Sequence, residues 1–167
     1  MDEGGGILLK FLLPYGCDES SVTQALHEAW ERCSEAGLSL SWVEEKTILK
    51  LKSPLAEKVN KLKTEINLLQ VVFVADPFSG AGFDHLSTLT TSIIGPRLLL
   101  FCLATGREVP NLPYPLFTAT MLGISVTFTG LDGTHLKRLV SLVQLMAGTV
   151  SKDYHDGVTH LVAAKVT

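Results

Sequence analysis

Short apolar runs and amphipathic stretches alternate along the first hundred residues of the chain. Strands are predicted at residues 6–13, 38–43, 71–75 and 92–94, where apolar residues are continuous or alternate with polar ones. Helices are predicted between them, most clearly at 22–33, where apolar residues recur at helical spacing. Because strands and helices alternate, the pattern predicts an α/β fold with a parallel sheet covered by helices on both faces.

Local signals mark the ends of several predicted helices. Ser21 and Gln24 have the spacing of a capping box at the start of the first helix, and Trp30 is predicted to be buried on its apolar face. Pro96 stands where a buried helix begins, as proline often does. The charged segment 44–69 contains a proline, and we predict a partly helical surface excursion there.

A proline-rich segment at residues 105–123 separates this pattern from a second one and is predicted to be a linker. A strand at 124–128, a helix ended by Gly148 and two further strands at 149–151 and 159–163 follow it. The chain is therefore predicted to hold three parts. These are a complete unit at 6–104, the linker at 105–123 and the truncated first half of a similar unit at 124–167.

Composition excludes several classes of function. The chain has 14 basic and 17 acidic residues and a net charge of -3, so no nucleic-acid partner is predicted. Its apolar runs are too short for a membrane span, and its three widely spaced cysteines are typical of reduced thiols. Because the sequence lacks zinc-ligand spacings, glycine fingerprints and a nucleophile elbow, we predict no metal site, no cofactor and no enzyme activity.

Two groups of residues remain as candidates for chemistry. Thr129 and Gly130 lie where a predicted strand turns into a helix, and the free N–H groups at a helix start favour an anion such as phosphate. Turn formation alone would also explain a Thr-Gly pair. His85 next to Asp84 could act as a base, but a local contact at a helix start is the favoured explanation, and His160 is predicted to be a core or hydrogen-bonding histidine.

The order and spacing of several segments resemble the BRCT repeat family. In the second unit the resemblance rests on residues 127–131, 144–150 and 158–163. In the first unit, residues 76–80 and 94–96 are similar to the degenerate repeat that opens a multi-BRCT scaffold and packs on the next repeat. The resemblance implies the BRCT fold, a four-stranded parallel sheet flanked by helices, present here as one full repeat plus the first half of a second.

The resemblance also implies a function. By position, Thr129 and Gly130 match the phosphate contacts of the family, and Lys137 adjoins the position of its basic helix residue. The first unit has residues 13–16, Leu-Pro-Tyr-Gly, instead of Thr-Gly, so we predict no phosphate site there. The expected protein is a nuclear, non-enzymatic scaffold in replication initiation and DNA-damage checkpoint signalling. Its expected partners are phosphorylated checkpoint or replication proteins.

Two alternatives stay open at this point. One is a docking module that binds protein without phosphate, such as the BRCT module of Rho exchange factors of cytokinesis. The other is a small α/β enzyme or nucleotide binder, against which the missing glycine motifs argue. The truncated second unit would also leave the strand at 159–163 with an unpaired edge.

Overall fold

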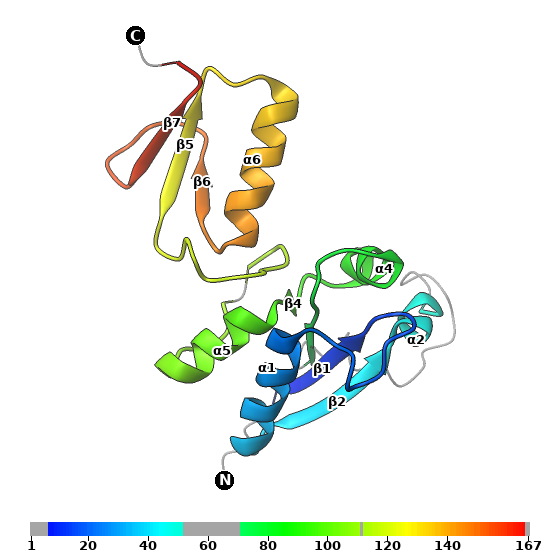
Figure 1. The fold of residues 1–167 in the computed structure, drawn as a ribbon. Coiled ribbons are helices and arrows are strands. Elements are labelled where there is room, and N and C mark those ends of the chain that lie inside the picture. Colours follow the sequence, from blue (N-terminus) through cyan, green and yellow to red (C-terminus); the bar gives the residue numbers. More distant parts are fainter. Residues whose placement is uncertain (1–6, 52–70, 111, 166–167) are drawn as a thin grey trace.

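The computed structural model describes residues 7–51, 71–110 and 112–165. Most of the predicted surface excursion, from residue 52 to 69, lies outside the described residues. The described elements form two units joined by the segment that was predicted to be a linker (Figure 1). We call the elements from β1 to α5 the first unit and those from β5 to β7 the second unit.

The first unit is built on a four-stranded parallel sheet with strand order β2-β1-β3-β4. Its strands are β1 (Leu8–Leu13), β2 (Ser39–Glu44), β3 (Val71–Val74) and β4 (Ile93–Ile94). All four coincide with predicted strands, which differ from them only at the ends. The predicted α/β fold with a four-stranded parallel sheet flanked by helices is therefore confirmed.

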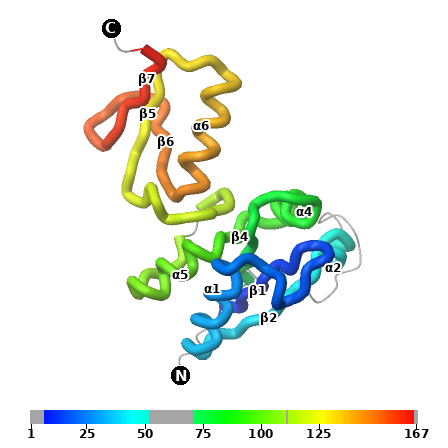
Figure 2. The backbone as a smooth tube through the Cα atoms, in the orientation of Figure 1, coloured from blue at the N-terminus to red at the C-terminus, as the bar shows by residue number. Residues whose placement is uncertain are grey.

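Helices cover both faces of this sheet (Figures 1 and 2). α1 (Gln24–Glu35) and α5 (Pro96–Thr105) pack together over one face, whereas α2 (Glu45–Leu49) and α4 (Ala81–Leu89) pack over the other. Side chains alternate between the faces along each strand. On β1, for example, Phe11 joins the core with α1 and α5, and Leu12 joins the other.

The structure corrects two predictions about α1. Its N-cap is Thr23, whose hydroxyl accepts from the N–H of Leu26 at 3.3 Å, rather than Ser21. Ser21 instead belongs to a turn with Asp18, which competes with helix formation as short polar side chains do. Trp30 is half-buried, not fully buried, because its ring stacks on Trp42 of the edge strand β2.

The second unit contains a three-stranded parallel sheet with strand order β6-β5-β7 and one helix. Its elements are β5 (Ser125–Thr129), α6 (Gly133–Leu145), β6 (Thr149–Ser151) and β7 (His160–Ala163). Among the described residues of both units, no helix is long and apolar enough to cross a membrane.

The end of α6 differs from the prediction that Gly148 caps it. Ala147, not Gly148, has the left-handed conformation, with φ of 63°. Gly148 is needed for a different reason, since a Cβ there would lie 2.7 Å from Cγ1 of Val143. The glycine therefore allows close approach of the chain to α6 instead of a left-handed turn.

The predicted linker forms backbone hydrogen bonds with both units. The N–H of Leu116 donates to the carbonyl of Ile93 at 3.0 Å, and the N–H of Gly95 donates to the carbonyl of Leu116 at 2.8 Å. The next residue, Phe117, donates its N–H to the carbonyl of Leu145 at the end of α6, at 2.7 Å. Leu116 is 2% exposed and lies in the core of the first unit. This segment is thus an ordered junction between the units.

Candidate functional site

Thr129 and Gly130 lie together at the carboxyl end of β5, where the chain turns towards α6. Thr129 is the last residue of the strand, and its carbonyl accepts from the N–H of Ala164 at 3.1 Å. Gly130 has φ of 73°, which favours glycine over residues with a Cβ. Both residues are exposed, so the threonine hydroxyl and the glycine amide are accessible to a ligand.

The start of α6 is capped by a carboxylate of the chain itself. Asp132 Oδ1 accepts from the N–H of His135 at 3.0 Å, and both carboxylate oxygens lie 3.0 Å from Nδ1 of the same histidine. Hydrogen bonds from the backbone and then the side chain of His135 hold the pKa of Asp132 below its ordinary value. A negative charge therefore already uses one of the helix-start N–H groups that sequence analysis assigned to phosphate.

Lys137 is exposed on α6, in the turn after the capped start. Its ammonium group makes no hydrogen bond or ion pair within the described part of the chain. The structure thus brings Thr129 and Gly130 together but links neither to Lys137. Sequence analysis missed Asp132, although an aspartate just before a predicted helix is a common N-cap signal.

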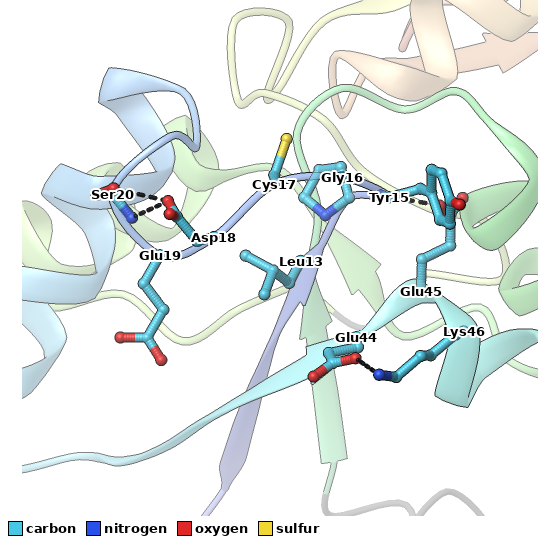
Figure 3. Close-up of a pocket in the computed structure, with 11 residues that line it drawn as sticks. Leu13, Tyr15, Gly16, Cys17, Asp18, Glu19, Ser20, Glu44, Glu45 and Lys46 are labelled. Atoms are coloured by element: carbon cyan, nitrogen blue, oxygen red, sulfur yellow. Dashed lines mark hydrogen bonds and ion pairs between the residues drawn. The ribbon is translucent and has the colours of Figure 1, made fainter.

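The first unit has a pocket of about 790 Å³ at the equivalent position, where β1 and β2 end (Figure 3). Ligands of parallel α/β sheets commonly bind at the carboxyl ends of the strands. The pocket is lined by Leu13, Pro14, Tyr15, Gly16, Cys17, Asp18, Glu19, Ser20, Glu44, Glu45 and Lys46. Four of these side chains are acidic and one is basic, and the latter pairs with Glu44 at 2.6 Å.

Glu45, which lines the pocket, accepts hydrogen bonds from two backbone amides. Its Oε2 accepts from the N–H of Tyr15 at 2.9 Å, and its Oε1 accepts from the N–H of Gly82 at 2.7 Å (Figure 3 shows the first bond). Hydrogen bonds from Ser20 and Ser21 hold the pKa of Asp18 below its ordinary value, so this side chain is ionised at neutral pH. These charges oppose phosphate binding.

The two candidate histidines have ordinary hydrogen bonds. The ring Nε2 of His85 lies within hydrogen-bond distance of the carbonyl of Leu51. His160 is exposed, and its Nδ1 lies 2.8 Å from the hydroxyl of Thr159, so it is a hydrogen-bonding and not a core histidine. Within the described ranges, no three His, Cys, Asp or Glu side chains are grouped so that they could hold a metal ion.

Comparison with known proteins adds a family match and two relatives. A family model described as "TopBP1, BRCT0 domain" matches residues 8–119. Human Protein ECT2 is 38% identical over 93 residues, and mouse Protein ECT2 is 36% identical over the same length. The matched region covers 55% of this chain and 10% of each relative, so the chain spans about a tenth of their length.

Two solved structures align with most of this chain at low identity. Rad4 BRCT1,2 in complex with a Mdb1 phosphopeptide has 14% identity and a TM-score of 0.34, covering 96% of this chain and 76% of that one. Yeast Rtt107 has 12% identity and a TM-score of 0.46, covering 95% of this chain and 34% of that one.

Proposed function

The chain belongs to the TopBP1 BRCT0 family, and from that membership we propose that it acts as a non-enzymatic protein-docking scaffold. The resemblance to BRCT proteins that open with a degenerate repeat is thereby confirmed for residues 8–119. BRCT domains generally serve as protein-interaction modules, and the two units described here have the layered α/β architecture that such modules use.

The observation that carries this proposal is the ordered junction between the units. Backbone bonds from Leu116 and Phe117 reach β4 on one side and α6 on the other. Such a junction holds two docking surfaces on one body, which suits a scaffold. Three of the four acidic side chains that line the pocket at the end of β1 make local bonds, namely Asp18, Glu44 and Glu45, an arrangement that supports a structural role over general acid-base chemistry.

The finer proposal concerns the partner. We propose that Thr129, the Gly130 amide and Lys137 bind a phosphorylated protein of DNA replication or checkpoint signalling, in the nucleus. Exposure of the hydroxyl and the amide supports it. The carboxylate of Asp132 opposes it, so binding by this 167-residue chain will be weak.

Calorimetry with a mixed-sequence phosphothreonine peptide pool and its unphosphorylated twin tests the partner proposal. We expect tighter binding of the phosphorylated pool, weakening in Thr129→Ala and strengthening in Asp132→Asn, which removes the opposing charge. Thr88→Ala, an exposed threonine of α4, is the matched control and should bind like the wild type. An unchanged affinity in Thr129→Ala would remove that residue from the site.

A second candidate is docking that does not depend on phosphate. It is favoured by two carboxylates that accept from backbone amides near the carboxyl ends of strands, Asp132 in the second unit and Glu45 in the first. Equal affinity for the two peptide pools would select it over the leading proposal. The location is tested separately, by imaging a fluorescent fusion of the chain, and exclusion from the nucleus would contradict the proposed role.

A further inference from the structure

One side chain of the acidic pocket in the first unit joins two turns that are distant in sequence. Glu45 is the first residue of α2, and its carboxylate accepts from the N–H of Tyr15 at 2.9 Å and from the N–H of Gly82 at 2.7 Å. These amides follow the adjacent strands β1 and β3 at their carboxyl ends (Figure 3 shows the bond to Tyr15). The two N–H groups therefore point into one small space, which the carboxylate fills.

The backbone around this carboxylate leaves room for an anion at the start of α4. The N-cap of α4 is Gly80, which has no side chain, so Glu45 supplies the acceptor that a capping side chain usually provides. A helix start also favours a negative charge. A Cβ at Gly82 would lie 2.9 Å from Oε1 of Glu45 and 2.5 Å from its Cγ. The glycine is thus what lets the carboxylate approach the backbone so closely.

Two converging N–H donors suit any anion that presents a pair of oxygens. Carboxylate and phosphate groups both accept two parallel bonds of this kind. Asp18, Glu19 and Glu44 also line the pocket, where Lys46 is the one basic residue. Repulsion by these carboxylates grows with the charge of the ligand, so the pocket favours a singly charged carboxylate over a doubly charged phosphate.

We propose that Glu45 is an internal ligand, which closes a carboxylate-binding site formed by the N–H groups of Tyr15 and Gly82. While its side chain is in place, both donors are used and an external anion is excluded. Once the side chain is removed, a small carboxylate such as acetate takes the site. The contact is therefore autoinhibitory, and it closes the first unit to anions. This inference concerns the first unit and does not depend on the site at Thr129.

Amide NMR spectroscopy of the 167-residue chain observes the two donors directly. In Glu45→Ala we expect sodium acetate to shift the signals of Tyr15 and Gly82 with a Kd of about 10–100 mM, as fits two hydrogen bonds at an open site. Sodium phosphate at equal ionic strength should bind about threefold or more weakly, because of its higher charge. In the wild type, acetate should leave both signals unchanged.

Glu44→Ala is the matched control for the Glu45 variant. It removes the same charge from the same pocket, but the Glu44 carboxylate pairs with Lys46 and not with a backbone amide. Acetate should therefore leave the signals of Tyr15 and Gly82 unchanged in this variant, as in the wild type. An equal response in the two variants would reduce the effect to pocket charge and would overturn the proposal.

Other results would also contradict it. A folded Glu45→Ala whose two amide signals ignore acetate refutes the site, and tighter binding of phosphate than of acetate refutes the ligand class. Hydrogen exchange of the wild type tests the closed state even if the variant does not fold. The amides of Tyr15 and Gly82 should exchange at least about tenfold more slowly than that of Gly16, which makes no hydrogen bond within the described residues. Fast exchange of either amide would refute the internal ligand. None of these outcomes bears on the docking function, which calorimetry tests separately.

Discussion

Gly95 lies where the linker crosses the first unit, and its replacement by alanine is the sharpest perturbation of that junction. A Cβ at this position would lie 2.2 Å from the carbonyl oxygen of Phe117 and 2.7 Å from its ring carbon Cδ2. The obstacle is mainly backbone, which cannot rotate away as a flexible side chain can. Gly95→Ala must therefore push the linker away from β4.

The size of the effect follows from what this displacement breaks. Two backbone hydrogen bonds, at 2.8 and 3.0 Å, join Leu116 to Gly95 and Ile93. Losing them costs about 1 kcal/mol each, and partial exposure of the buried Leu116 side chain costs about 1.5–3 kcal/mol. We expect Gly95→Ala to lower the free energy of unfolding by about 3–5 kcal/mol.

Urea unfolding of the 167-residue chain, followed by far-ultraviolet circular dichroism, measures this loss. Gly133→Ala is the matched control, because no atom lies within 4 Å of a Cβ at the first residue of α6. The control should be unchanged or up to about 1 kcal/mol more stable, since alanine favours helix over glycine. Gly95→Ala should also accelerate proteolysis between residues 105 and 123. A loss below about 1 kcal/mol would refute the ordered junction, as would slow cleavage in a destabilised variant.

Three further predictions follow from other parts of the molecule. Trp30→Ala should lower the free energy of unfolding by about 2–3 kcal/mol in urea unfolding, less than full burial implies, because the half-buried ring contacts two aromatic rings. The pKa of Asp132 is depressed, so the stabilisation it gives is present above its ordinary value of 3.8 and is lost as pH falls through the lower folded value. Asp132→Asn should therefore flatten the fall of Tm between about pH 5 and 2, and an unchanged slope would contradict the cap. Burial raises the pKa of Cys33 to about 11, so mass spectrometry should show iodoacetamide labelling the partly exposed Cys17 well before Cys33, and equal rates would contradict this.

The fold was predictable from the sequence because its strands are buried on both faces. Continuous apolar runs such as the one at residues 71–75 form only where helices cover both sides of a parallel sheet. Alternation of these runs with a periodic helix pattern then fixed the α/β class. The second unit was predictable from its spacing of apolar residues, which places the buried Val126 on a strand and the buried Val143 on a helix.

Local details were harder because several residues compete for the same role. Ser21 and Thr23 can both cap a helix, and the choice follows from the turn that Asp18 makes with Ser21. Gly148 follows a predicted helix, where a glycine often forms the cap, yet the left-handed turn occurs at Ala147. Glycine is required at 148 because the chain packs tightly against α6 there. Such outcomes depend on contacts that no local pattern contains.

The candidate site was predictable in position but not in electrostatics. Thr129 and Gly130 lie at the predicted strand-to-helix turn. That Asp132 turns back onto His135, and that Glu45 reaches the amides of Tyr15 and Gly82, depends on side-chain directions and on loops distant in sequence. The negative charge of these carboxylates opposes the binding of an anion, so a motif alone could not establish phosphate binding.

The stacked indoles on α1 and β2 make the chain a selective optical reporter. Trp30 and Trp42 are the two tryptophans of the sequence, and their rings lie 4.7 Å apart with an angle of 19° between planes. Both belong to the first unit, so tryptophan fluorescence monitors the unfolding of that unit. Unfolding confined to the second unit should leave the tryptophan fluorescence almost unchanged. Circular dichroism at amide wavelengths records both units. A difference between the two melting curves would therefore separate the stabilities of the units without any added label.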